Sequence, residues 1–178
     1  MENNNWNSVG TVNKTFEDKI DSWYFHFWLW TVIGLPFLLI VIGIIPLLVA
    51  TVFECFILYH AWKAIPNNPW QVPPILAVLL VFAPVVGAIW AFWVYWLMSQ
   101  EMNRELAKKG NAYRTDEALI FIYCVLYSIV YAFMSIPMFP TITIIIGVIV
   151  GIPASIVGIF AIRSIKNGVL VLHRYESV

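Results

Sequence analysis

The sharpest chemical feature of the sequence is a single acid, Glu54, inside a long apolar stretch. The stretch runs from Trp23 to Trp62 and contains no other Asp, Glu, Lys or Arg. A carboxyl group at mid-bilayer depth costs about 3 kcal/mol or more unless it is paired, protonated or hydrated. Glu54 can therefore be a proton or cation site, or a polar clamp to another subunit. Alternatively, it is a protonated acid that hydrogen-bonds to a neighbour such as Ser128 or a tyrosine.

Two histidines, His26 and His60, form a second candidate site. In a helical hairpin that turns at Gly43, they lie equally far from the turn and at the same membrane level. Two facing histidines can bind haem iron or a metal, and one can ligate the magnesium of chlorophyll. An imidazole also suits the headgroup level of a membrane without any ligand. Two alternatives therefore remain open. Either the protein is a haem- or chlorophyll-carrying subunit, or the histidines bind no cofactor.

Polar and small residues also recur at helical spacing. Tyr123, Tyr127 and Tyr131 share one face of a predicted helix, which can line a polar path or hydrogen-bond to a neighbouring helix. Small residues at such spacing let helices approach closely in lipid. Two segments carry them: Ala83, Gly87 and Ala91 in one, and Gly147, Gly151, Ser155 and Gly158 in the other.

Several function classes find no support in the sequence. It contains no HExxH pair, no phosphate-binding glycine loop and no metal-spaced cluster of Cys and His. The two cysteines, Cys55 and Cys124, both lie inside apolar stretches. The net charge is zero, so the chain lacks the basic footprint of nucleic-acid-binding proteins. We therefore predict a protein that is not an enzyme and does not bind nucleic acid.

Composition indicates which elements position these residues. The chain is 61% hydrophobic and 11% charged, against about 25% charged in soluble domains. A transmembrane helix needs about 20 apolar residues. We therefore expect an all-α polytopic transmembrane helix bundle over residues 22–172, with a polar N-terminal tail (1–21) and a C-terminal tail (173–178). The five predicted transmembrane helices cover residues 22–41, 44–64, 73–98, 117–136 and 141–163. In a four-helix alternative, residues 23–30 lie flat at the interface and one long helix follows Pro36.

Local signals refine the third and fourth predicted helices. Pro84 predicts a kink in the third helix. Beyond residue 98 the helix continues out of the membrane, supported by Glu101 with Arg104 and Glu105 with Lys109. Gly110 predicts its end, because glycine favours the helix C-terminus. Thr115 is expected to cap the next helix, with Asp116 and Glu117 at the positive end of its dipole.

Basic residues in short loops mark the cytoplasmic side of a membrane protein. In the five-helix arrangement, the N-terminus lies outside a bacterial inner membrane and the C-terminus lies in the cytoplasm. The four-helix alternative places the N-terminus inside and gives a stronger charge bias, whereas span length favours five helices. The cytoplasmic set shared by both arrangements is Arg104, Lys108, Lys109, Arg114, Arg163, Lys166 and Arg174.

The middle of the chain carries a pattern found elsewhere. Residues 58–65 (LYHAWKAI), a Pro-rich loop, and residues 77–106 (AVLLVFAPVVGAIWAFWVYWLMSQEMNREL) follow one another. This order resembles a set of uncharacterised bacterial multi-span membrane proteins, in which a Tyr-x-Ala-Trp-Lys-x-Ile helix end precedes a Pro-containing aromatic span. Where those proteins have an Asn before the aromatic run, this chain has Gly87-Ala88. The resemblance implies a bacterial multi-span membrane protein and implies no activity.

Three functions remain open from the sequence. The first is a non-catalytic accessory or scaffold subunit of a larger membrane protein complex, of respiratory or photosynthetic type, with the lipid bilayer and other subunits as partners. Its grounds are the small size, the two small-residue segments and the aromatic content of nine Trp, eight Tyr and twelve Phe. The second is a small oligomeric transporter or channel that uses Glu54. The third is the pigment- or haem-carrying subunit that uses His26 and His60.

Overall fold

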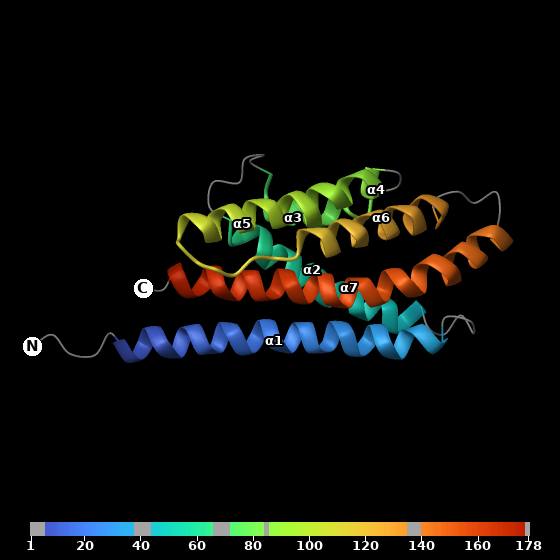
Figure 1. The fold of residues 1–178 in the computed structure, drawn as a ribbon. Coiled ribbons are helices and arrows are strands. Elements are labelled where there is room, and N and C mark those ends of the chain that lie inside the picture. Colours follow the sequence, from blue (N-terminus) through green and yellow to red (C-terminus); the bar gives the residue numbers. More distant parts are fainter. Residues whose placement is uncertain (1–5, 38–43, 66–71, 84–85, 135–139, 177–178) are drawn as a thin grey trace, which may run out of the picture.

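The computed structural model describes residues 6–37, 44–65, 72–83, 86–134 and 140–176, and the regular structure in them is entirely helical (Figure 1). The longest helices come from the apolar stretches and the polar segments next to them. In chain order the helices are α1 (Trp6–Phe37), α2 (Ile44–Lys63), α3 (Pro74–Leu80), α4 (Val86–Ala91), the π-helix η2 (Phe92–Leu97), α5 (Met98–Lys108), α6 (Glu117–Met134) and α7 (Pro140–Glu176).

The helices pack into one bundle around a shared apolar core. α1 pairs with α2, α6 pairs with α7, and α7 also lies against α1 and α2. Figure 1 shows α1 and α7 running side by side, with α4, α5 and α6 on the other side of α7. The core takes residues from α2, η2, α5, α6 and α7, including Ile57, Val94, Met102, Ile120 and Ile162. It therefore joins segments from most of the chain.

The prediction of five transmembrane helices is wrong. Among the described residues, two helical segments are long and apolar enough to cross a membrane: Ile45–Lys63 of α2 and Val148–Tyr175 of α7. The apolar part of α6, Glu117–Ala132, is shorter than this requirement. α1 is not apolar enough to meet the requirement, because half of its length is polar sequence. Residues 73–98 do not meet the length requirement, because they do not form one helix.

Residues 73–98 form a hairpin, so the prediction of a kinked helix is also wrong. The Trp90 indole donates a hydrogen bond to the Ala77 carbonyl at 2.8 Å. In a straight helix these residues would lie about 20 Å apart. A Cβ built on Gly87 would lie 2.1 Å from the carbonyl oxygen of Val81. The chain therefore reverses between Val81 and Gly87, and α4 returns alongside α3.

The N-terminal segment is helical from Trp6 onward instead of a polar tail up to residue 21. Its acidic side chains pair with the far end of the chain. Lys166 Nζ donates to Asp21 Oδ1 at 2.6 Å, and Arg174 Nε donates to Glu17 Oε1 at 2.5 Å. These bonds hold the N-terminal half of α1 against the C-terminal half of α7. The predicted arrangement with the two termini on opposite sides of a membrane is therefore wrong.

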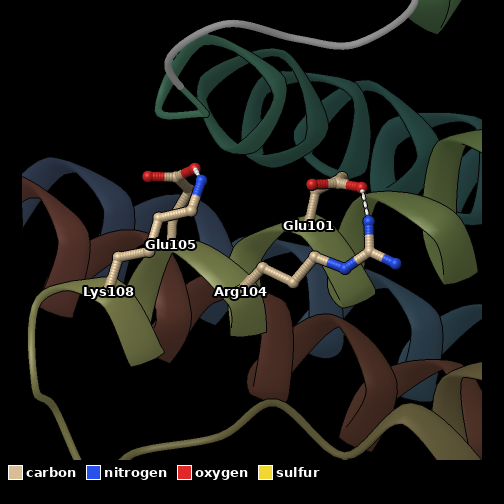
Figure 2. A network of polar contacts seen from close by, with 4 residues as sticks. All are labelled: Glu101, Arg104, Glu105 and Lys108. Carbon is tan, nitrogen blue, oxygen red and sulfur yellow. Dashed lines mark hydrogen bonds and ion pairs between the residues drawn. The ribbon is translucent and has the colours of Figure 1, made fainter.

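α5 carries the charged exit that the sequence predicts, with one change of partner. Glu101 pairs with Arg104 as expected, whereas Glu105 pairs with Lys108 at 2.6 Å instead of Lys109. Figure 2 shows both pairs along one side of the helix. The three-residue spacing of each pair is one of the two that bring side chains together on a helix surface.

The connection from α5 to α6 follows the predicted stop but uses a different cap. Gly110 has a φ of +70°, the left-handed conformation that favours glycine after a helix. The cap of α6 is Asp116, whose Oδ1 accepts the backbone N–H of Leu119 at 3.0 Å. Thr115 instead donates its hydroxyl to Asn103 Oδ1 at 2.9 Å. Thr115 therefore fastens this connection to α5 and is not the cap.

Candidate functional site

Glu54 is the centre of a buried polar cluster between three elements. It lies in the middle of α2 and is 8% exposed. Its Oε1 accepts one hydrogen bond from the Tyr95 hydroxyl of η2 at 2.8 Å and another from the Tyr123 hydroxyl of α6 at 2.9 Å. Of the two partners considered from the sequence, a tyrosine of residues 117–136 is the one found. Ser128 instead donates to the Ala88 carbonyl at 2.6 Å.

Tyr95 is the member of this cluster that sequence reasoning missed. It is 1% exposed, whereas Trp93 is 37% exposed, two residues earlier in the same π-helix. A π-turn shifts the helix face by one residue relative to a regular α-helix and is frequent at functional sites. The available signal in the sequence was a tyrosine hydroxyl between two tryptophans in FWVYWL.

The three tyrosines of α6 line up toward the same place. Tyr123 and Tyr127 have ring centroids 6.1 Å apart, and Tyr127 stacks on Tyr131 at 5.6 Å with an angle of 13° between the rings. Tyr95 meets Tyr123 edge-on at 5.2 Å. The predicted stripe therefore faces the interior of the bundle and continues the polar cluster away from Glu54.

A cavity of about 140 Å³ opens beside the Glu54 carboxyl. Both hydrogen bonds of that carboxyl end on Oε1, and among the described residues no side chain bonds to Oε2. Of the described residues that line the cavity, Glu54 is the one that can carry a charge. The wall consists of Thr51, Glu54, Cys55, Leu58, Val78, Val81, Phe82, Tyr95, Tyr127 and Tyr131. The site is thus an acid in a cavity wall, with one carboxyl oxygen held by two tyrosine hydroxyls.

Small residues allow the tyrosines to approach. A Cβ built on Gly158 of α7 would lie 2.8 Å from the Tyr123 ring, and one on Gly87 would lie 3.1 Å from Tyr131. Ala91 is fully buried, and its carbonyl accepts a hydrogen bond from Cys124 of α6. These three positions explain how α4 and α7 come close to α6.

The remaining predicted packing positions do not share this role. Gly151 has no atom within 4 Å of a built Cβ, and Ser155 donates to the Gly151 carbonyl of its own helix. Ala83 lies between α3 and α4, within the reversal of the chain, where its carbonyl accepts the Gly87 N–H at 2.7 Å. The surroundings of Gly147 lie outside the described residues. Gly168, which the sequence did not single out, would place a Cβ 2.2 Å from Met102 Sδ.

The two histidines do not face each other. His26 stacks on Phe53 at 4.9 Å and its Nδ1 lies 2.7 Å from the Ser22 carbonyl. His60 lies instead against Trp23 at 5.0 Å and against Phe16 at 5.5 Å. The geometry expected for a haem held by both histidines is therefore absent. Within the described residues, no group of three or more His, Cys, Asp or Glu side chains is placed to hold a metal ion.

Comparison of the chain with protein-family models, with curated proteins and with solved structures found no match.

Proposed function

We propose that this protein is a membrane transport protein in which Glu54 is the proton-binding group. The membrane location is supported by α2 and α7, which are long and apolar enough to cross a bilayer. Only 33% and 28% of the residues in their most apolar windows are buried, unlike the core helix of a soluble protein. Large apolar side chains such as Ile45, Ile89 and Ile149 point outward from three different helices. Lipid is the natural cover for such a surface.

The proposed orientation places the charged end of the bundle in the cytoplasm of a bacterial cell. The ion pairs Arg174–Glu17 and Lys166–Asp21 bring both ends of the described chain to that end. The Asn111 amide, which follows α5, donates to the Tyr175 hydroxyl at 3.0 Å. Figure 1 places α5 and both termini together. Basic residues concentrate on the cytoplasmic side of membrane proteins, which supports this assignment.

The observation that carries the proposal is the Glu54 carboxyl, which is fixed by two tyrosine hydroxyls and borders a cavity at the same time. An acid with a purely structural role would accept hydrogen bonds from the protein on both carboxyl oxygens. Among the described residues, Oε2 of Glu54 has no side-chain hydrogen-bond partner, so it is available to a ligand. Acids inside membranes are costly and mark ion and proton pathways. Val78 of α3 and the turn residues Val81 and Phe82 form part of the cavity wall, and irregular backbone at membrane depth is tolerated where it lines such a space.

The test is proton movement in proteoliposomes that contain a pH-sensitive dye and carry an imposed potassium diffusion potential. The wild-type chain is expected to change the internal pH several-fold faster than Glu54→Gln. The matched control is Glu101→Gln, which removes an acid of the same type from the charged end of the bundle. This control is expected to retain the wild-type rate.

Equal rates for the wild type, Glu54→Gln and empty liposomes would overturn the transport proposal. Co-purification with defined membrane subunits, in the absence of any such flux, would instead favour the accessory subunit expected from the sequence. One preparation therefore distinguishes a transport protein from an accessory subunit, because the same extract serves for reconstitution and for identification of partners.

A further inference from the structure

The size of the cavity beside Glu54 limits what it can hold. Its volume of about 140 Å³ is close to that of an apolar protein cavity of about 150 Å³ that binds benzene. A ligand of about six non-hydrogen atoms or fewer fits such a space. Part of the wall is apolar, with Val78, Val81 and Phe82 from α3 and the turn after it, and Leu58 from α2. The ligand should therefore be small and should have an apolar body.

Three hydroxyl groups near the acid already donate hydrogen bonds within the protein. Tyr95 and Tyr123 donate to Glu54 Oε1, and Thr51 donates to the Leu47 carbonyl at 2.9 Å. A hydroxyl whose proton is spent can still accept a hydrogen bond. The Oε2 atom can only accept while Glu54 is ionised. The polar end of the ligand should therefore be a donor.

The charge of Glu54 and the aromatic rings of the wall further limit the chemical class of the ligand. Of the described residues that line the cavity, Glu54 is the one that can carry a charge, so an ionised site is neutralised by a single positive charge. Tyr127 and Tyr131 stack in the wall, and Tyr95 lies 6.2 Å from Tyr127. Ammonium groups bind favourably over such rings. A hard metal ion is a poorer match, because Ca²⁺ and Mg²⁺ take about six or more oxygen ligands and the cavity offers one carboxyl.

From this geometry we infer that the cavity binds a small organic ammonium ion, an amine of a few carbons in its protonated form. Its N–H groups donate to Glu54 Oε2, and its carbon chain lies against Val78 and Phe82. The inference rests on the proposed function in taking the Glu54 cavity as the ligand site, and it names the class of ligand. No bond is made or broken, and binding itself requires only that Glu54 be ionised.

The experiment is calorimetric titration of the full chain, purified in a non-ionic detergent, with n-butylammonium as the probe. Saturable binding is expected for the wild type and for Glu101→Gln. Glu54→Gln is expected to bind at least about tenfold more weakly, because a charge-assisted hydrogen bond becomes a neutral one. Three further probes test the wild type alone, so the result does not depend on the folding of a variant. 1-Butanol lacks the charge, tetrabutylammonium exceeds the cavity, and sodium chloride supplies a cation without a carbon chain.

Binding of n-butylammonium with none of the three further probes competing supports the inference. Equal binding of 1-butanol, or competition by sodium at similar concentration, overturns it. Absence of n-butylammonium binding also overturns it, and the proposed function still stands if Glu54-dependent proton movement is observed. Conversely, ammonium binding without any flux upholds the site and overturns the transport proposal.

Discussion

Substitution of Gly87 by alanine tests the reversal of the chain between α3 and α4. The added Cβ would lie 2.1 Å from the Val81 carbonyl oxygen and 2.9 Å from its carbonyl carbon. Both are backbone atoms, so no side-chain rotation relieves the contact. The neighbouring Trp90–Ala77 hydrogen bond ties the two arms together and limits how far they can separate.

The magnitude follows from two opposing effects. Replacing a helical glycine by alanine is favourable by up to about 1 kcal/mol where space allows. Overpacking a closed site costs about 1–3 kcal/mol. Gly151 is the matched control, because a Cβ there meets no atom within 4 Å. We expect Gly151→Ala to be neutral or stabilising and Gly87→Ala to be destabilising, with a difference of about 2–4 kcal/mol between them.

The assay is reversible unfolding in mixed micelles by increasing fractions of sodium dodecyl sulfate, followed by tryptophan fluorescence. Loss of the hairpin should also change the emission of Trp90, whose indole is bonded inside it. If Gly87→Ala and Gly151→Ala unfold with the same free energy, Gly87 is not in contact with Val81. The chain reversal would then be wrong, and the prediction of one continuous helix over residues 73–98 would be favoured again.

Three further predictions concern polar contacts. Asn103→Ala should destabilise the fold by about 2–4 kcal/mol in the same unfolding assay, because the Asn103 side chain bonds to the N–H, carbonyl and hydroxyl of Thr115. A change below about 1 kcal/mol would contradict this prediction. Tyr123→Phe should cost about 1–3 kcal/mol by leaving the buried carboxyl with one donor, and an unchanged stability would show that the bond is not made. The hydrogen bonds from Arg174 lower the pKa of Glu17 from its usual 4.5, so the pair stabilises the fold above that pH and the gain is lost as the pH falls through the lowered pKa. Glu17→Gln should therefore be less stable than the wild type at pH 7, by about 1 kcal/mol at most for so exposed a pair. The difference should disappear as the pH falls through the lowered pKa of Glu17, and a difference that persists below it would count against the pairing.

Much of the site follows from local sequence patterns. A four-residue period places Tyr123, Tyr127 and Tyr131 on one helix face, and an isolated acid in an apolar helix must find a polar partner. Together they suffice to suggest a Glu54–tyrosine contact. Tyr95 could not be inferred in the same way, because its inward direction depends on the π-turn of η2. A one-residue change in helix register is invisible in a run of aromatic residues.

The hairpin and the histidines show where sequence reasoning ends. A long apolar run with a proline is compatible with one kinked helix or with two short helices that fold back, and hydrophobicity alone does not separate them. The choice depends on contacts across the reversal, such as Trp90 with Ala77. The histidine pairing failed because the register of α1 against α2 is centred a few residues before Gly43. His26 consequently opposes Phe53 and not His60.

The fold-back of α3 and α4 also has a consequence for how the chain is made. The arms depend on α2, which is synthesised before them, and on α6, which is synthesised after them. Ala88 and Ala91 find their hydrogen-bond partners in Ser128 and Cys124 of α6. While the ribosome is still translating the charged exit of α5, these partners do not yet exist. The hairpin can therefore dock only late, and the cavity beside Glu54 is completed after the residues that form most of its walls have been synthesised.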